Sequence, residues 1–279
     1  MPNLFDITGK VAVVTGAGAN GGIGHAIALG FAQQGANVAV ADIDDDGAQT
    51  TAEEIRVLGR DVLVQHCDIA QPDEVEALFA AVDAHFGRVD ILVNVPYTFP
   101  SRVHPDGLTL ADWEQTLRVN LTGYFLCAQQ AIRRMLHQGE VAQVGGAILN
   151  IGSIAGVSAL GRGNFPYSVS KAGVSQMTKE LAVEYAGQGI RVNAILPAQV
   201  LTPSFKQRLL GDPRFSEKLQ QRLLHGIPLN RLLEPEDFVG PALFLCSAAA
   251  AAVTGVLLPV DGGNLALNAG GNHIWPVDS

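Results

Sequence analysis

The sequence predicts an α/β fold in which a doubly wound parallel sheet is covered by helices on both faces. Short apolar runs rich in β-branched residues alternate with amphipathic helical patterns along most of the 279 residues. The expected strands are apolar throughout rather than at every second position, which is typical of parallel strands buried on both faces. Because no break in composition and no internal repeat divides the chain, we expect a single domain.

The elements are expected in regular alternation. A strand at residues 10–15 leads through a glycine-rich turn into a helix in which Ile23, Ile27 and Phe31 recur every four residues, up to Gly35. Further strands are expected at residues 37–41, 61–66, 90–93, 147–151, 191–196 and 256–260. Further helices are expected at residues 46–58, 72–86, from 109 onward, 163–185, 201–225 and 235–247.

Composition and charge exclude several classes of protein. Hydrophobic residues make up 48% of the chain and charged residues 16%, as in a compact domain with a large core. The net charge is −9 and no Lys/Arg cluster occurs, which argues against nucleic-acid and membrane partners. We expect Cys67, Cys127 and Cys246 to be buried thiols of a cytoplasmic protein, with no metal site. Asp6 and Lys10 interrupt the first residues, so no signal peptide is expected.

The first strand, turn, helix and second strand have the pattern of a dinucleotide site. A G-x-G-x-x-G sequence, formed by Gly16, Gly18 and Gly21, lies between the first strand and the first helix. Such glycines let backbone N–H groups approach a pyrophosphate at the helix N-terminus. Asp42, 18 positions beyond Gly24, can accept hydrogen bonds from ribose hydroxyls. The alternative, a merely tight turn between strand and helix, leaves Asp42 unexplained.

Tyr167 and Lys171 stand four residues apart, so they lie on one face of a helix. A Tyr side chain has an ordinary pKa of about 10, and a neighbouring ammonium lowers that pKa by favouring the phenolate. Such a pair can exchange a proton with an alcohol or a carbonyl near neutral pH. The same spacing also occurs by chance on helix surfaces, so its meaning depends on the rest of the chain.

Over residues 5–263 the chain resembles the short-chain dehydrogenase/reductase family, whose motifs occur in the family's order. They are the Thr-Gly-x3-Gly-x-Gly turn at Thr15, Gly16, Gly22 and Gly24, the aspartate at Asp68, the helical Asn at Asn120, the Ser at Ser153, the Tyr-x3-Lys pair at Tyr167 and Lys171, and Asn-x3-Pro at Asn193 and Pro197 followed by Thr202. The resemblance implies a single-domain Rossmann fold that transfers a hydride between a nicotinamide cofactor and an alcohol or ketone.

The resemblance also implies a role for each catalytic residue. Tyr167 would be the general base in oxidation and the acid in reduction, while Lys171 would lower its pKa and hold the nicotinamide ribose. Ser153 would bind the substrate oxygen, and Asn120 would hold a water that links Lys171 to solvent. The alternatives are that Ser153 only caps a turn and that Asn120 only stabilises a helix bend. The implied cofactor-binding residues are Gly16, Gly22, Ile23, Gly24, Asp42, Asp68, Ile69, Asn94, Tyr167, Lys171, Pro197 and Thr202.

Three stretches depart from the family's pattern. The first gap of the glycine turn has five residues where three are usual, which widens the phosphate loop. Residues 94–97 read Asn-Val-Pro-Tyr where Asn-Asn-Ala-Gly is usual. Pro96 therefore lacks an N–H, and Tyr97 adds a ring where glycine lets the backbone pass close to the cofactor. Ala198 follows Pro197 in place of a glycine. The last two changes could reshape the nicotinamide end of the pocket.

Asp42 indicates which cofactor is used, because its charge would repel the 2′-phosphate of NADP and neither Ile43 nor residues 19–22 offer Lys or Arg. NAD is therefore expected. Residues 199–231 stand where the family has its substrate loop. The expected substrate is a sugar, polyol or sugar acid. A 3-oxoacyl-thioester reductase is the alternative, and a non-catalytic dinucleotide-binding sensor is an alternative of another class. Arg102 and His104 could hold an acid group, although solvated loop residues are commoner.

The helices at residues 113–135 and 163–185 carry more apolar residues than one sheet face requires, and a homotetramer is expected. Residues 264–279 form a tail beyond the last strand. Leu265, Ile274 and Trp275 make this tail more apolar than a disordered terminus. We expect the tail to pack on the protein and to help close a substrate pocket, across an interface between subunits.

Overall fold

Seven parallel strands form one sheet in the computed structural model, which describes residues 3–99, 103–138, 145–161, 163–203, 205–207 and 224–267. The strand order is β3-β2-β1-β4-β5-β6-β7. The strands are β1 Val11–Thr15, β2 Asn37–Asp42, β3 Val62–His66, β4 Ile91–Asn94, β5 Gly146–Ile151, β6 Ile190–Pro197 and β7 Leu257–Val260. Each lies within one residue of its expected bounds. The predicted fold class is confirmed.

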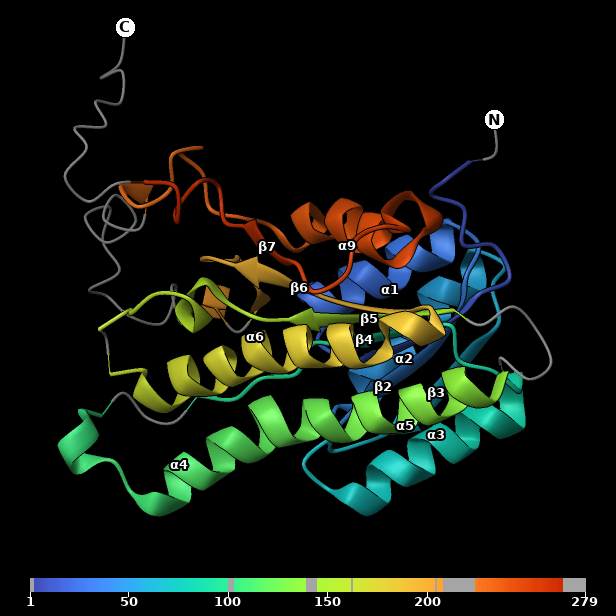
Figure 1. The fold of residues 1–279 in the computed structure, drawn as a ribbon, viewed down its shortest axis with the longest axis horizontal. Helices are drawn as coiled ribbons and strands as arrows, with labels where there is room; N and C mark the ends of the chain where they lie inside the picture. Colours follow the sequence, from blue (N-terminus) through green and yellow to red (C-terminus); the bar gives the residue numbers. More distant parts are fainter. Residues whose placement is uncertain are drawn as a thin grey trace, which may run out of the picture.

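Helices cover both faces of this sheet, as Figure 1 shows with α1 and α9 on one side and α3, α5 and α6 on the other. The α-helices are α1 Ile23–Gln33, α2 Asp45–Val57, α3 Pro72–Phe86, α4 Leu110–Leu117, α5 Tyr124–Gln138, α6 Phe165–Tyr185 and α9 Val239–Cys246. Short helical turns are η1 Pro105–Gly107, η2 Arg118–Gly123, η3 Ile154–Gly156, η4 Ala186–Gln188, η5 Pro235–Phe238 and η6 Ala248–Ala250. The helix expected at residues 201–225 falls largely outside the described residues.

Each strand of the sheet centre divides its side chains between two apolar layers. In β1, Ala12 and Val14 join the layer under α1, α2 and α9, while Val11 and Val13 join the layer under α3, α5 and α6. Successive side chains of a strand point to opposite faces, so both layers draw on the same continuous apolar run. Across the described part of the chain, no helix is long and apolar enough to span a bilayer. The three cysteines are buried and unpaired, as expected.

The strand order reverses between β1 and β4, because the chain leaves β1 toward β2 on one side and returns to β4 on the other. In open parallel sheets, ligands bind at such a point, in the crevice beyond the carboxyl ends of the strands. The glycine turn after β1, Asp42 at the end of β2 and Asn94 at the end of β4 all lie at this edge. The topology therefore brings together the polar residues that the sequence places after separate strands.

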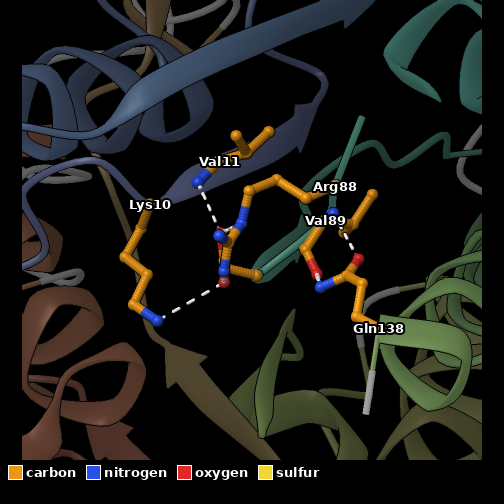
Figure 2. Close-up of polar contacts among 6 residues, drawn as sticks. Lys10, Val11, Arg88, Val89 and Gln138 are labelled. Carbon is orange, nitrogen blue, oxygen red and sulfur yellow. Dashed lines mark hydrogen bonds and ion pairs between the residues drawn. The ribbon is translucent and has the colours of Figure 1, made fainter. Parts of the chain in front are cut away.

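A buried carboxylate fixes the opposite edge of the sheet, where β1 and β4 begin. Asp90, which is only 4% exposed, accepts a hydrogen bond from the backbone N–H of Val11 at 2.9 Å and one from Arg88 Nη2 at 2.6 Å. The side chain of Gln138, at the end of α5, pairs with both the N–H and the carbonyl of Val89 (Figure 2). These contacts set the register of β1 against β4 at the end remote from the crevice.

Candidate active site

Four side chains gather beyond the carboxyl ends of β4 and β5. Tyr167 lies in the first turn of α6 and Lys171 one turn later, while Ser153 follows β5 and caps η3 by accepting a hydrogen bond from Ala155 N at 3.1 Å. Asn120 lies in η2, the π-helical turn that joins α4 to α5. All four side chains are buried. The long helix expected from residue 109 is thus α4, a π-turn and α5, with the π-turn at the candidate residue.

Lys171 has an unusual environment for a cation. The side chain is 1% exposed, and its Nζ donates hydrogen bonds to the carbonyl oxygen of Ile151 at 2.7 Å and to the hydroxyl of Tyr124 at 3.1 Å. The same Nζ lies 4.6 Å from the centroid of the Tyr124 ring and 6.0 Å from that of Tyr167. Burial lowers the pKa of Lys171 to about 7, because the ammonium loses its hydration. The charged form of Lys171 is therefore less favourable than that of an exposed lysine.

Tyr167 differs from the expectation that Lys171 lowers its pKa. Burial raises the pKa of Tyr167 to about 12, while a hydrogen bond with Ser153 acts in the opposite direction and the neighbouring Tyr97 adds to the increase. Desolvation of the phenolate thus outweighs the stabilising contacts in this arrangement. The hydrogen bond with Ser153 is the contact that the sequence assignment requires, since it brings the Ser153 hydroxyl beside the phenol oxygen.

The side chain of Asn120 pairs with the backbone of the segment that follows β4. Its Oδ1 accepts from Thr98 N at 2.7 Å, and its Nδ2 donates to Thr98 O at 3.0 Å and to Ser170 Oγ at 3.2 Å. Both N–H donors of the amide are therefore engaged. The π-turn and this pairing place Asn120 between residues 97–99 and α6, which fits the alternative that it stabilises a helix bend. The water proposed for Asn120 is not tested by these contacts.

Two residues of this region escaped the sequence analysis. Asn150, in β5, accepts from Asn94 Nδ2 at 3.0 Å and donates to Thr178 Oγ1 at 3.0 Å, so a buried polar chain joins β4, β5 and α6. A polar residue inside an otherwise apolar strand was the available signal. The second is Tyr124, whose hydroxyl contacts Lys171; its position one helical turn after Asn120 was the only indication.

The unusual Val-Pro-Tyr stretch after Asn94 builds an aromatic wall beside Tyr167. The ring centroids of Phe99 and Tyr167 are 4.3 Å apart, and those of Tyr97 and Phe99 are 5.1 Å apart in an edge-to-face arrangement. Pro96 packs on the glycine turn, since a Cβ at Gly16 would lie 3.0 Å from its ring. Two residues of the departure from the family's sequence therefore make contacts here: Pro96 with the glycine turn, and Tyr97 with the rings of Phe99 and Tyr167.

The glycine turn and α1 are suited to a pyrophosphate. Gly22 caps α1 without a side-chain hydrogen bond, so the first backbone N–H groups of the helix are left for a ligand. A Cβ on Gly24 would collide with the carbonyl oxygen of Gly16, which explains the glycine there. The Oδ1 atom of Asn94, buried at the same edge, has no hydrogen-bond partner among the described residues. Each feature fits a dinucleotide in the crevice.

Asp42 is held at the end of β2 by the widened glycine loop. Its Oδ2 accepts from Gly18 N at 2.7 Å, and its Oδ1 accepts from Asp44 N at 3.0 Å. The widened loop thus contacts the carboxylate through the backbone N–H of Gly18. Each carboxylate oxygen retains a lone pair for a ribose hydroxyl.

The remaining expected residues lie at the same edge of the sheet. Asp68 and Ile69 follow β3, where Asp68 Oδ1 accepts from Ala70 N at 2.9 Å. Pro197 ends β6 and Thr202 is buried shortly beyond it. His104 is exposed, whereas Arg102 lies outside the described residues.

The expected substrate loop and tail are described only in part. Phe205 and Leu201 pack on the buried Ile227 and Leu232, and Lys206 Nζ lies 3.7 Å from Glu234 Oε2. Residues 208–223, which include the apolar and basic side chains expected in the substrate loop, are outside the described part.

Residues 268–279, including Ile274 and Trp275, also lie outside the described part. The start of the tail is described: Leu265 packs on Ile154 and Leu196, next to Ser153.

A parallel sheet with a glycine turn after its first strand, and with Ser, Tyr and Lys gathered at its carboxyl edge, defines the class of α/β oxidoreductases that bind dinucleotides. Residues 16–264 match the family described as enoyl-(acyl carrier protein) reductase. The chain belongs to the short-chain dehydrogenase/reductase family, and its relatives are named as dehydrogenases that act on alcohols.

Three relatives illustrate the range of substrates in the names of similar proteins. D-threitol dehydrogenase of Mycolicibacterium smegmatis is 41% identical over 263 residues, covering 93% of this chain and 94% of that protein. Cis-4-hydroxycyclohexanecarboxylate dehydrogenase of Sinomonas cyclohexanicum is 38% identical over 92% of this chain and 97% of that protein. The solved structure of a gluconate 5-dehydrogenase from Burkholderia cenocepacia, in complex with NADP and tartrate, has a TM-score of 0.84 and 32% identity, covering 95% of this chain and 98% of that one.

Proposed function

We propose that this enzyme transfers a hydride between NAD(H) and a secondary alcohol or ketone, with a sugar, polyol or sugar acid as the substrate. The observation that carries the proposal is the cluster in which Tyr167 shares a hydrogen bond with Ser153 and lies on the same helix face as the buried Lys171. The names of two relatives, D-threitol dehydrogenase and gluconate 5-dehydrogenase, support a polyhydroxylated substrate.

The chemistry follows from the three side chains. A bound nicotinamide supplies the hydride chemistry. Ser153 would donate its hydroxyl proton to the substrate oxygen, while one of its two lone pairs accepts from Ala155 N. Tyr167 takes the alcohol proton as a phenolate during oxidation and returns it as a phenol during reduction. Lys171 stabilises that phenolate through its positive charge and holds the ribose hydroxyls.

The cofactor would be held by residues from five strand ends. The glycine turn and α1, with Gly16, Gly22, Ile23 and Gly24, would hold the pyrophosphate. Asp42 would accept the ribose hydroxyls of NAD, and its charge would oppose the 2′-phosphate of NADP. The rest of the crevice would be lined by Asp68, Ile69, Asn94, Pro197 and Thr202. The structure of one relative was solved with NADP, so the family resemblance does not select the cofactor. The proposal of NAD for this chain therefore rests on the charge of Asp42.

The aromatic wall favours a second substrate class. Tyr97 is 41% exposed and, with Phe99, lies beside Tyr167. Such rings bind the C–H faces of sugars, but they also suit a saturated carbocycle that carries one secondary hydroxyl. A relative named for cis-4-hydroxycyclohexanecarboxylate adds weight to this alicyclic alternative.

The same proposal includes a homotetramer. Large apolar side chains are exposed on α5 and α6, among them Phe125 at 44%, Val169 at 37% and Val183 at 82%. Patches of this kind on neighbouring helices are typical of subunit interfaces.

The test is a panel of polyols, aldoses, sugar acids and alicyclic alcohols, assayed with NAD and NADP through the absorbance of the reduced cofactor. We expect one polyhydroxylated substrate to be oxidised in preference to the rest. Tyr167→Phe should reduce turnover by at least about 10²-fold, because it removes the acid–base group, while NADH binding should persist. A Tyr167→Phe enzyme with turnover close to that of the wild type would refute the assignment of Tyr167.

A further inference from the structure

Tyr124 is the second hydroxyl that touches the catalytic cluster. It is the first residue of α5, immediately after the π-turn, and its side chain is 0% exposed. Its hydroxyl accepts a hydrogen bond from Lys171 Nζ at 3.1 Å and donates one to the carbonyl oxygen of Ile151 at 3.2 Å. The phenol therefore bridges the ammonium of Lys171 and the backbone at the end of β5.

Packing alone does not explain this hydroxyl. A buried phenol has to find a partner, whereas Phe would fill the same volume without a polar atom. Lys171, in contrast, has three ammonium donors and needs acceptors in a place without free access to water. Its contacts are Ile151 O, the Tyr124 hydroxyl and the face of the Tyr124 ring, 4.6 Å from Nζ.

We propose that Tyr124 is a positioning residue for the catalytic pair: its hydroxyl and ring hold the ammonium of Lys171 in place and keep it charged, so that it can stabilise the phenolate of Tyr167. The inference rests on the proposed roles of Tyr167 and Lys171. Tyr124 touches neither the substrate nor the reacting atoms in this scheme, and it acts only through Lys171.

Tyr124 contributes a dipole and not a charge. Burial raises its pKa well above the ordinary value, with Tyr167, Cys127 and Tyr97 adding to the increase, so it remains a phenol throughout the range of enzyme assays. A neutral hydroxyl can accept from the ammonium and donate onward at the same time, which an additional carboxylate could not do.

The helices and strands that pack around Tyr124 and Lys171 contribute few other ionisable side chains near these two residues. Tyr167 faces Lys171 from α6, Tyr97 lies beyond Tyr167, and Cys127 lies one turn beyond Tyr124 on α5. The stretch from β5 through η3 has no ionisable side chain. The other charged residues of the packed helices and of β6 have different partners or face solvent. Arg134 pairs with Asp83, Asp112 with Thr109, and Arg191 of β6 donates to the carbonyl of Leu245. The exposed ones are Glu114, Arg118, Arg133, His137, Lys179, Glu180 and Glu184.

Removal of the hydroxyl would leave an ammonium donor without its acceptor. The ring of Phe occupies the space of the Tyr ring but supplies no oxygen to accept from the ammonium. The charged form of Lys171 becomes less favourable, and the phenolate of Tyr167 loses stabilisation. Because a hydrogen bond to a charged group is strong, the apparent pKa of the Tyr167–Lys171 pair for alcohol oxidation should rise by about one unit or more.

The experiment compares the pH dependence of kcat/KM for alcohol oxidation in the wild type and in Tyr124→Phe. We expect the acidic limb of the mutant profile to move about one pH unit upward, with roughly tenfold lower activity at neutral pH that recovers in alkaline buffer. The control is Tyr185→Phe, which removes a hydroxyl from the partly buried ring at the end of α6. Its profile should coincide with that of the wild type.

A second variant keeps the test valid if Tyr124→Phe does not fold. Incorporation of 3-fluorotyrosine at position 124 keeps the hydroxyl and almost the same volume but makes the oxygen a weaker acceptor, so a smaller shift in the same direction is expected. If the acidic limb of the pH profile is not shifted in a folded variant, the proposal is wrong. If Tyr167→Phe is inactive and that limb is unshifted, only the role of Tyr124 fails. If Tyr167→Phe is active, the proposed function fails first.

Discussion

At the scale of single residues, Lys171 connects stability with function. Burial lowers the pKa of Lys171 from the ordinary 10.5 to about 7. Burying this ammonium therefore lowers the free energy of unfolding of the protein. The hydroxyl of Tyr124 and the carbonyl of Ile151 offset part of that cost. A buried lysine and a buried tyrosine that both have shifted pKa values are the arrangement expected of a catalytic site and not of a hydrophobic core.

The lowered pKa of Lys171 predicts how stability depends on pH. Between about pH 7 and 10.5 the unfolded chain keeps the proton on Lys171 and the folded protein releases it, so this group makes the free energy of unfolding rise with pH. Lys171→Met lacks that contribution. We therefore expect the stability of Lys171→Met relative to the wild type to fall as pH increases, by at most about 1.4 kcal/mol per unit.

Urea unfolding at a series of pH values from 6 to 10, at one protein concentration, measures this difference. Parallel dependences for the two proteins would show that Lys171 has the same pKa in the folded and unfolded states.

Asp42 gives the second residue-scale prediction, which concerns cofactor choice. Asp42→Asn keeps an oxygen that can accept from Gly18 N but removes the charge. The ratio of kcat/KM for NADP to that for NAD should increase by roughly tenfold or more, because a charged hydrogen bond to the ribose is lost and the repulsion of phosphate disappears. Asp44→Asn is the control, since Asp44 only caps α2 by accepting from Gly47 N. A wild-type preference for NADP would contradict the proposed role of Asp42 in selecting NAD.

At the scale of elements, the turn between β1 and α1 depends on close contact between two glycines. A Cβ on Gly24 would meet the carbonyl oxygen of Gly16, and α1 could not start at the same distance from β1. This contact brings the helix N-terminus to the edge of the sheet, where its N–H groups can bind a pyrophosphate. The geometry of the cofactor site is thus set by one backbone contact.

Gly24→Ala should accordingly abolish measurable NADH binding and lower the free energy of unfolding by roughly 1–3 kcal/mol or more. The matched control is Gly240→Ala in α9, where a Cβ would meet nothing within 4 Å. Alanine in that helix should be neutral or stabilising by up to about 1 kcal/mol. Fluorescence titration with NADH and thermal unfolding report the two effects. Normal NADH affinity in Gly24→Ala would show that the turn relaxes without moving α1.

At the scale of the whole molecule, α5 and α6 lie on the same side of the sheet in Figure 1, and both helices carry exposed apolar residues. Val183, near the end of α6, is 82% exposed, whereas Val174, Thr178 and Ala182 of the same helix are buried. A single chain gains nothing from such a face, whereas a second copy of the chain would bury it.

Light scattering of the wild type at micromolar concentration should therefore give the mass of four chains. Val183→Asp should shift the mass toward smaller species, because a charge would be buried in the contact. Val57→Asp is the control. Val57 is 87% exposed and lies on α2, which covers the other face of the sheet. A wild-type protein with the mass of one chain would refute the tetramer.

The sequence by itself determined what local patterns encode. All seven strands, the position of α3, the glycine turn and the placement of Asp42 and Asn94 at strand ends followed from apolar runs, helical periodicity and turn residues. The spacing of Tyr167 and Lys171 fixed their common helix face. Because parallel strands present their carboxyl ends at one edge, these local features were sufficient to predict that the candidate residues gather there.

Only the tertiary structure decided how that site is tuned. The contact between Lys171 and Tyr124 joins residues 47 positions apart, and the pairing of Asn120 with Thr98 joins residues 22 positions apart. The π-turn interrupts a helix whose sequence periodicity continues through it. The pKa of Tyr167 is raised and not lowered, because burial is a property of everything that surrounds the side chain. Periodicity along the chain contains no information about such surroundings, which exist only once the layers have packed.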